Sequence, residues 1–286
     1  MRHRHERQTN VAFINRAFVP LAEAKVSIED RGFQFGDGVY EVIRTYKGRP
    51  FALEAHLARL DRSATALDLT QPYSHSEWTD YILEGIRRAA FPEAKIYIQL
   101  SRGVAPRDHA YSTELTPTVV MTVREFHPLD RSVQAAGVDA LTTEDIRWGR
   151  CDIKSVNLLA NVLARQQVKQ AQVFEAILVR AGLVTEGAVS TVMVVQGGTV
   201  MTAPEGPHIL SGVTRAVVLD LARSEGIAIQ ERCVSQEDLY GADEVFLTGT
   251  TVEVLAVVRI DGKVIGDGRP GPITQQLAAG FTKQVG

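Results

Sequence analysis

The chain has 286 residues, a formal net charge of −3 and a hydrophobic fraction of 45%, which are the values of a soluble globular protein with room for one large or two ordinary domains. The charge excludes a global field that would attract nucleic acid or an anionic membrane. No apolar run approaches the ~20 residues that a membrane helix needs.

The N-terminal stretch Met1–Arg7 is basic, and we expect it to be a solvated arm. His3 and His5 have no third ligand at useful spacing, so we expect no metal site there. Cys151 and Cys233 are too few for a disulfide framework and are typical of a reducing compartment. Because the N-terminus also lacks a signal peptide's apolar region, we expect a cytoplasmic protein.

The first half of the chain is predicted to combine a largely antiparallel sheet with two helices. Val39–Tyr46 alternates in the manner of a strand, and Trp78, Ile82 and Ile86 recur at helical spacing. The predicted strands are Val11–Phe18 with its turn, Lys25–Ile28, Val39–Tyr46, Ala94–Arg102 and Thr118–Arg124, and the predicted helices are Glu54–Ala66 and Ser76–Ala90.

The second half begins after Glu125–Val133, whose proline and mixed charge indicate a domain link. The predicted strands are Gly137–Thr143, Glu175–Arg180, Val189–Val195 and Glu244–Thr248, with a turn at Gly182, and the predicted helices are Lys154–Gln170, Ser211–Gly226 and Ile273–Thr282. We therefore predict two packed domains of the α+β or α/β class. The expected division is a basic flexible arm over 1–10, an N-terminal domain over 11–124, a linker over 125–134 and a C-terminal domain over 135–286.

One of the seven lysines has unusual neighbours. Lys154 lies between Ile153 and the apolar residues Val156, Leu158 and Leu159, whereas the other six have turn residues or polar neighbours. Partial desolvation favours the neutral, nucleophilic amine, which Schiff-base chemistry with a carbonyl cofactor requires. The segment is equally compatible with a lysine at a helix start that extends its charged end into water.

Two polar segments of the first half are candidates for substrate binding. Glu29–Glu41 contains three glycines that predict an irregular loop, and Tyr40 opens the strand that follows. This loop lacks the spacing of a dinucleotide fingerprint. Arg107 and His109 are two residues apart and can face one side of an extended segment, where they would grip a carboxylate. Taken alone, an ordinary surface loop is the simpler interpretation.

Three segments of the chain have features that suit an anionic cofactor. Leu210–Arg215 opens a predicted helix, whose free N–H groups favour a phosphate, and Thr248–Thr251 adds hydroxyl groups. Arg59 is positioned on a predicted helix from which it can close such a site. Glu186 lies between Val184 and Gly187, so its half-buried carboxylate needs a protonated partner, either a pyridinium or an arginine. Together with Lys154, these are the contacts that pyridoxal phosphate and an amino acid demand.

In their order and spacing, these motifs resemble those of the class IV (branched-chain type) pyridoxal-phosphate aminotransferases. Within that family the chain looks most like the D-amino acid aminotransferases. The resemblance runs from about Val11 to the C-terminal helix and is carried by EDRGFQFGDGVYEV, PRDH, EDIRWGRCDIKSVNLL, VTEG, ILSGVTR and TGTT. It implies that family's two-domain fold, with pyridoxal 5′-phosphate between the domains. The implied activity is transamination between D-amino acids, of the D-alanine or D-glutamate type, and 2-oxo acids such as 2-oxoglutarate or pyruvate.

The resemblance also implies roles for individual residues. Lys154 matches the lysine that binds the cofactor and moves the substrate proton, and Glu186 matches the acid that keeps the ring nitrogen protonated. The other expected cofactor-binding residues are Arg59, Leu210, Val213, Thr214, Gly249, Thr250 and Thr251. The residues that match the substrate carboxylate trap are Tyr40, Arg107 and His109, and those expected to support the site are Arg31, Arg147 and Glu41. The Arg107–His109 loop is expected to reach in from a neighbouring subunit, which implies a homodimer with a shared active site.

The chain departs from the family pattern at two places, and other functions remain open. Ala188–Thr191 stands where the family often has Ser-x-x-Asn, and Gly249 stands where many relatives have serine. The alternatives within the family are branched-chain L-amino acid aminotransferases, R-selective amine transaminases and aminodeoxychorismate lyases. The Arg–x–His pair favours the D-amino acid branch. Outside the family, the alternatives are a non-catalytic binding protein with this fold and a nucleic-acid binder that uses the basic arm.

Overall fold

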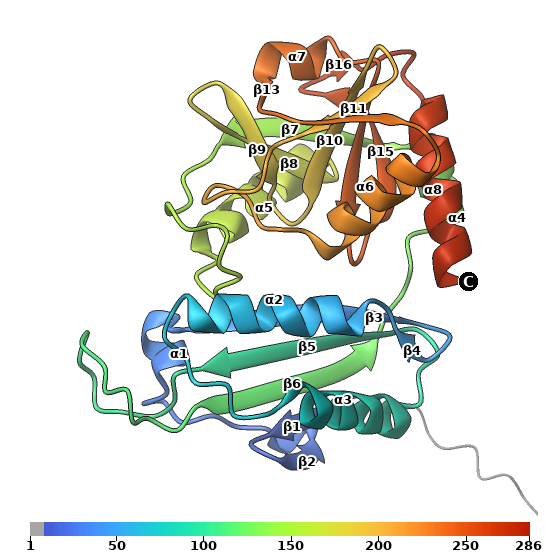
Figure 1. Cartoon of the computed structure of the whole chain (residues 1–286). Helices are drawn as coiled ribbons and strands as arrows, with labels where there is room; N and C mark the ends of the chain where they lie inside the picture. The colour runs from blue at the N-terminus through green and yellow to red at the C-terminus, as the bar shows by residue number, and fades with distance from the viewer. Residues whose placement is uncertain (1–8) are drawn as a thin grey trace, which may run out of the picture. The chain divides into compact units, whose positions relative to one another are not determined.

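The computed structural model describes residues 9–286, which form two compact units (Figure 1). One unit consists of the chain up to His127 together with Ile153–Asn157, and the other of Pro128–Asp152 together with Leu158–Gly286. Residues 1–8 of the expected basic arm, with His3 and His5, lie outside the described range. Within that range no helix combines the length and the apolar character needed to cross a membrane.

The first unit is built on a six-stranded antiparallel sheet in the order β2-β1-β6-β5-β3-β4. Its strands are β1 (Val11–Ile14), β2 (Ala17–Pro20), β3 (Gly38–Tyr46), β4 (Arg49–Pro50), β5 (Ala94–Ser101) and β6 (Thr118–Glu125). Its helices are the short 3₁₀ turn η1 (Leu21–Glu23), α1 (Arg31–Phe35), α2 (Leu53–Thr65) and α3 (His75–Ala89).

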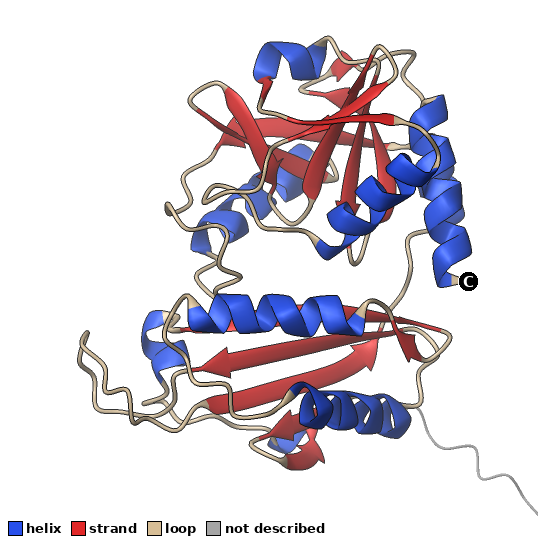
Figure 2. Cartoon of the chain, viewed as in Figure 1, coloured by secondary structure: helices blue, strands red, loops and turns tan. Residues whose placement is uncertain are grey.

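Two amphipathic helices cover this sheet (Figure 2). The helix α2 packs on β3, and α3 packs on β1 and β6. Leu57 and Leu60 of α2 and Trp78 and Ile82 of α3 are fully buried in the same apolar cluster as Phe13 of β1. Burial of side chains of this size stabilises the unit by about 1.5–3 kcal/mol each.

Two features of the first unit differ from the sequence-based expectation. Lys25–Ile28 is not a strand, because no neighbouring strand pairs with it among the described residues and the side chains of Val26 and Ile28 are exposed. The glycine-rich stretch Glu29–Glu41 was expected to be an irregular loop, but it contains the helix α1. Asp30 starts α1 by accepting a hydrogen bond from the backbone N–H of Gly32 (2.8 Å).

The second unit contains a mixed ten-stranded sheet in the order β12-β11-β10-β14-β15-β7-β8-β9-β13, with β16 paired to β15. Its strands are β7 (Val138–Glu144), β8 (Glu175–Arg180), β9 (Leu183–Gly187), β10 (Thr191–Gln196), β11 (Thr199–Thr202), β12 (Ala228–Glu231), β13 (Val234–Ser235), β14 (Glu244–Gly249), β15 (Glu253–Ile260) and β16 (Lys263–Val264). Its helices are α4 (Arg131–Ala136), α5 (Leu159–Ala171), α6 (Val213–Ser224), α7 (Gln236–Tyr240) and α8 (Pro272–Val285). The parallel strands β7 and β8 are joined through α5, and α6 and α8 pack on β14.

The structure revises several predicted boundaries in this unit. The helix predicted from Lys154 begins only at Leu159, because the residues before it pair with β3. The predicted strand Val189–Val195 begins at Thr191, and the turn at Gly182 joins β8 to the additional strand β9. The strands β11, β12, β13, β15 and β16 and the helix α7 were not expected.

The division between the units also differs in detail from the expected domains. The boundary between His127 and Pro128 lies inside the expected linker, but part of that linker is the helix α4. Asp130 caps α4 by accepting a hydrogen bond from the backbone N–H of Ser132 (2.7 Å). Lys154 was expected in the C-terminal domain, whereas its segment packs within the first unit.

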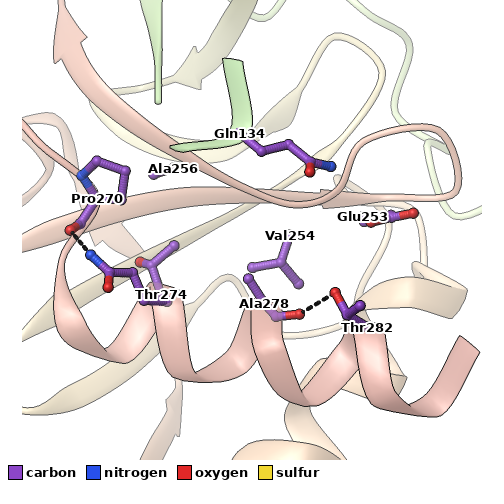
Figure 3. A pocket seen from close by; sticks show the side chains of 9 residues that line it. Gln134, Glu253, Val254, Ala256, Pro270, Thr274, Ala278 and Thr282 are labelled. Atoms are coloured by element: carbon purple, nitrogen blue, oxygen red, sulfur yellow. Dashed lines mark hydrogen bonds between the residues drawn. The ribbon is translucent and has the colours of Figure 1, made fainter. Parts of the chain in front are cut away.

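A small pocket of about 80 Å³ lies in the second unit between α8 and β15, next to α4 (Figure 3). Gln134, Glu253 and Thr274 contribute polar groups to its wall, and Val254 and Ala278 contribute apolar ones. None of the residues that line this pocket was predicted for the functional site.

Candidate active site

The backbone of Lys154 is fixed by strand pairing. The N–H of Tyr40 donates to the carbonyl oxygen of Lys154 (2.9 Å), and the N–H of Val156 donates to that of Gly38 (3.0 Å). Ser155 forms an isolated antiparallel bridge with Val39. Residues 153–157 thus extend along the first residues of β3.

The Lys154 side chain lies over an aromatic ring. Its Nζ is 4.3 Å from the centre of the Tyr40 ring, and the residue is half-buried. The Tyr40 ring in turn lies 5.7 Å from that of Tyr97. Burial first, and then the neighbouring Tyr40 hydroxyl, raises the pKa of Tyr97 to about 12. The amine of Lys154 is therefore held against Tyr40, and both residues were predicted for the site.

Arg59 is held by a buried carboxylate. Its Nε donates to Glu41 Oε1 (2.7 Å) and its Nη2 donates to Oε2 (2.9 Å), a two-pronged contact that fixes the plane of the guanidinium. His56, one turn earlier on α2, lies 2.8 Å from Glu41 Oε2 through Nδ1. Because a carboxylate only accepts, His56 is the donor in this bond.

The charges of this cluster follow from its surroundings. Burial alone would raise the pKa of Glu41, but the charge and hydrogen bonds of Arg59, together with the hydrogen bond from His56, outweigh it and lower that pKa to about 2. Burial lowers the pKa of His56 despite the adjacent carboxylate, so the imidazole is neutral near pH 7. One negative and one positive charge therefore lie beside the neutral imidazole of His56.

The predicted substrate residues Arg107 and His109 lie against α1. The Arg107 guanidinium is 4.5 Å from the centre of the Phe35 ring, and the His109 ring is 5.4 Å from it. Both side chains thus contact the same aromatic ring. In the part of the chain that the structure describes, no hydrogen bond, ion pair or ring contact joins either of them to Tyr40.

Arg31 lies next to the same loop. Its Nε donates to Asp37 (2.8 Å), and its Nη2 donates to the carbonyl oxygen of His109 (3.1 Å). These contacts of Arg31 are therefore with Asp37 and the loop rather than with the lysine segment.

Glu186, on β9 of the second unit, pairs with an arginine, which is one of the two kinds of partner expected for it. Arg147 Nη1 donates to Glu186 Oε1 in a short contact, and the backbone N–H of Leu210 donates to Oε2 (3.1 Å). Asp145 binds the same arginine through Nε (2.9 Å) and accepts from Thr185 Oγ1 (3.0 Å). Burial would raise the pKa of Asp145, but Arg147 outweighs it and lowers the pKa to about 2. Arg147 thus connects two buried carboxylates.

The two predicted anion-binding segments of the second unit lie close together. The helix α6 begins at Val213 after Gly212, which offers no side-chain cap, so the first N–H groups remain available for an anion. A Cβ on Gly212 would lie 2.9 Å from Thr191 Oγ1, and Thr191 pairs directly with Thr248. The backbone at the start of α6 therefore lies close to the end of β14.

The end of β14 continues into the second of these segments. Gly249, Thr250 and Thr251 are half-buried and lead into the turn before β15. Thr248 Oγ1 is buried, and within residues 9–286 it has no hydrogen-bond partner. An uncapped helix start beside a buried, unsatisfied hydroxyl group fits a phosphate group.

Several residues of these clusters were not among the predicted ones. His56 stands three residues before Arg59, so helical spacing already places both on one face of α2. Asp145 stands two residues before Arg147, which is a weaker signal. Asp37 contacts both Arg31 and Arg102, and neither Asp37 nor Arg102 carried a signal in the sequence.

Comparisons with known proteins agree with this chemistry. A family model described as amino-transferase class IV matches residues 38–260. The chain is 43% identical over 271 residues to a D-alanine aminotransferase of Bacillus licheniformis, covering 95% of each chain. It is also 43% identical over 273 residues to a D-alanine aminotransferase of Staphylococcus haemolyticus, covering 96% of this chain and 97% of that one.

Solved structures are similar over almost the same length. The branched-chain amino acid aminotransferase of Escherichia coli matches with a TM-score of 0.90 at 27% identity, covering 96% of this chain and 94% of that chain. The branched-chain aminotransferase of the thermophilic archaeon Thermoproteus uzoniensis, solved with norvaline, matches with a TM-score of 0.86 at 29% identity, covering 96% and 94%. The two-domain fold expected from the motifs is thereby confirmed.

Proposed function

The chain belongs to the class IV aminotransferase family, and on this premise we propose that it transfers amino groups between D-amino acids and 2-oxo acids with pyridoxal 5′-phosphate as cofactor. The Lys154 amine over the Tyr40 ring is the observation that carries the proposal, because it holds a nucleophile in a half-buried site. The D-amino acid preference is supported by the relatives that bear the name D-alanine aminotransferase and by the Arg107–His109 pair.

The cofactor and two side chains, Lys154 and Tyr40, have separate roles in the proposed reaction. When bound, pyridoxal 5′-phosphate supplies an aldehyde that condenses with amines and a ring that withdraws electrons from the substrate carbon. Lys154 would hold the cofactor through its amine, and in the reaction its Nζ would accept the proton from the substrate Cα. The Tyr40 ring orients Nζ during both tasks.

In this proposal, residues of the second unit would hold the cofactor ring and make most of the phosphate contacts. Glu186 would maintain a proton on the ring nitrogen, and the hydrogen bond from Arg147 orients its carboxylate. The residues that would bind the phosphate are Arg59, Val213, Thr214, Thr250 and Thr251, and Leu210 and Gly249 would contribute further cofactor contacts. Glu41 holds the Arg59 guanidinium in a fixed plane for this purpose.

We propose that Arg107 and His109 bind the substrate carboxylate in the active site of a second copy of the chain, together with that copy's Tyr40. A homodimer is supported by large apolar side chains that are exposed in the single chain, because such side chains favour burial in an interface. They include Val26, Ile28 and Phe33 in the first unit and Leu159, Val162 and Leu163 in the second.

A reducing compartment such as the cytoplasm is part of the same proposal. Cys151 and Cys233 are both free thiols, which such a compartment preserves. Mass spectrometry of protein alkylated directly in cell lysate would detect both thiols as reduced.

A second candidate is transamination of branched-chain L-amino acids, favoured by the names of the solved structures that the fold matches. The two candidates differ in the enantiomer and in the size of the substrate side chain. Parallel assays with D-alanine, L-leucine and (R)-1-phenylethylamine, each with 2-oxoglutarate, separate them from each other and from an amine transaminase.

The first experiment is transamination from D-alanine to 2-oxoglutarate by protein reconstituted with pyridoxal 5′-phosphate, with pyruvate measured through lactate dehydrogenase. We expect D-alanine to be the preferred donor and Lys154→Ala to be inactive, because no other group replaces the amine. Lys283→Ala, which changes an exposed lysine of α8, is the matched control and should keep full activity. Turnover by Lys154→Ala, or a preference for L-leucine, would contradict the proposal.

A further inference from the structure

The loop that carries Arg107 and His109 is exposed over almost its entire length. It spans residues 104–116 between β5 and β6. Gly103 adopts φ +107°, and a Cβ there would lie 2.0 Å from the carbonyl oxygen of Thr116. The two ends of the loop therefore meet in close backbone contact. An exposed loop loses conformational entropy when it is ordered, so this one needs specific anchors.

Arg31 provides such an anchor through backbone carbonyl groups. Its Nη1 donates to the carbonyl oxygens of Asp108 (2.5 Å) and Ala110 (3.4 Å), and its Nη2 donates to that of His109 (3.1 Å). The Arg31 residue itself is only 3% exposed. A buried guanidinium that binds three successive carbonyl groups fixes the path of this backbone.

One carboxylate supports this anchor and a second one. Asp37 accepts from Arg31 Nε (2.8 Å) and from Arg102 Nε (2.8 Å) and Nη2 (3.0 Å). The Arg102 guanidinium lies 3.6 Å from the centre of the ring of Tyr111, the loop residue that follows Ala110. Burial would raise the pKa of Asp37, but the two arginines outweigh it and lower the pKa. Asp37 therefore stays charged and fixes both arginines under the loop.

The same helix orients the loop's functional side chains. Phe35, one turn after Arg31 on α1, lies 4.8 Å from the Arg31 guanidinium as well as against Arg107 and His109. The Arg107 guanidinium also donates to the carbonyl oxygen of Gln34 (3.4 Å). The direction of Arg107 and His109 therefore depends on how the loop backbone sits on α1.

We propose that Arg31 is a positioning residue for substrate recognition: it fixes the loop backbone at residues 108–110 so that Arg107 and His109 point at the substrate carboxylate. This inference rests on the proposed function, in which these two side chains bind that carboxylate. Because the loop serves the second copy of the chain in that proposal, Arg31 acts on the active site of its neighbour. Its loss affects binding of the carboxylate more than the proton transfer at Lys154.

The test compares Arg31→Lys with the unchanged enzyme as cofactor-loaded protein. Lysine keeps the positive charge beside Asp37 but lacks the planar fork that spans three carbonyl groups. We expect the KM for D-alanine to rise about tenfold, the effect of losing one or two hydrogen bonds from a charged donor, while kcat changes less than about threefold. Arg88→Lys, an exposed arginine paired with Glu84 on α3, is the matched control and should change neither.

A second measurement reports on the loop without relying on activity. Chymotrypsin cleaves after Tyr111, and mass spectrometry follows the cleaved fraction with time. We expect Arg31→Lys to be cleaved about tenfold faster than the unchanged protein, because the loop opens more often. If Arg31→Lys does not fold, Asp37→Asn, which removes the charge that holds both arginines, should show the same two effects.

The outcomes distinguish this inference from the function it rests on. An unchanged cleavage rate together with an unchanged KM would overturn the role of Arg31, even if D-alanine is the substrate. A fall in kcat with KM unchanged would overturn it as well. If the unchanged enzyme did not transaminate D-alanine, the proposed function would fail, and the carboxylate role of the loop would fail with it, whatever the cleavage rate.

Discussion

Replacement of Glu41 by glutamine tests whether the buried Glu41–Arg59 pair stabilises the first unit. Glutamine has the same shape as glutamate, but its amide NH₂ group is a donor and cannot accept the hydrogen bonds of Arg59 and His56. Arg59 also loses its counter-charge. The fall of the Glu41 pKa from 4.5 to about 2 corresponds to about 3 kcal/mol in favour of the charged form. Removal of one partner from a buried ion pair costs about 3–5 kcal/mol, which is the loss that we expect for Glu41→Gln.

Urea unfolding of the cofactor-free protein measures this loss. Trp78 is fully buried in the apolar cluster of the first unit, so its fluorescence reports the relevant transition. With an m-value of about 1–3 kcal/mol/M, we expect the midpoint for Glu41→Gln to fall by about 1–3 M. Glu41 has a lowered pKa, so its contribution is complete above pH 4.5 and is lost as the pH falls towards 2. The difference between the two proteins should therefore shrink over that range.

A double-variant cycle separates the pair from its surroundings. Arg59→Met alone leaves Glu41 as an uncompensated charge, whereas Glu41→Gln with Arg59→Met removes both charges. We expect the double variant to lose less stability than the sum of the single ones. Additive losses, or a midpoint change below about 0.3 M for Glu41→Gln, would refute the reasoning.

Two further predictions concern the loop and the helix pair of the first unit. Gly103→Ala should lower the free energy of unfolding by at least about 2 kcal/mol in thermal unfolding, because its Cβ would overlap the Thr116 carbonyl group. Gly48→Ala, where a Cβ meets open space, is the control, and an equal or smaller loss for Gly103→Ala would contradict this prediction. His75 of α3 lies between Asp61 (2.5 Å) and Glu54 (3.2 Å) of α2, and these carboxylates, Asp61 foremost, raise its pKa. The stabilising effect of His75 is therefore complete below pH 6.5 and is lost as the pH rises through the raised pKa. His75→Asn should lower the melting temperature more at pH 5.5 than at pH 9. Equal decreases at the two pH values would argue against this role of His75.

The amphipathic helices of the first unit were predictable because local signals agree with packing. The predicted helices Glu54–Ala66 and Ser76–Ala90 each lie within one residue of α2 and α3. Ser74 and Glu77 form a reciprocal capping box that fixes the start of α3, and Ser74 precedes the first apolar residue of its buried face. The start and the buried face of such helices are determined by residues that are close together in the sequence.

The segment around Lys154 was harder to read because its pairing partner is more than a hundred residues away. Val156, Leu158 and Leu159 have helical spacing, yet the residues up to Asn157 pair with the start of β3 instead. The apolar neighbours of Lys154 were a correct guide to its half-buried setting and a wrong guide to its secondary structure.

The site clusters were predictable as residues but not as pairs. Arg59, Glu41, Arg147 and Glu186 were all named from motifs, since each stands in a recognisable run of sequence. That Glu41 binds Arg59 and that Arg147 binds Glu186 depends on which elements pack together. Such packing is set by the whole core, which no single stretch of sequence encodes.

The insertion of Ile153–Asn157 into the first unit has a consequence for dissecting the protein. A fragment ending at His127 would contain every strand of its sheet but would leave the N–H of Tyr40 and the carbonyl oxygen of Gly38 without their native acceptor and donor. The complementary fragment would carry Lys154 on a segment with no strand for it to pair with. Mixing two such polypeptides should therefore restore the lysine's setting by strand complementation, and neither half alone should retain it.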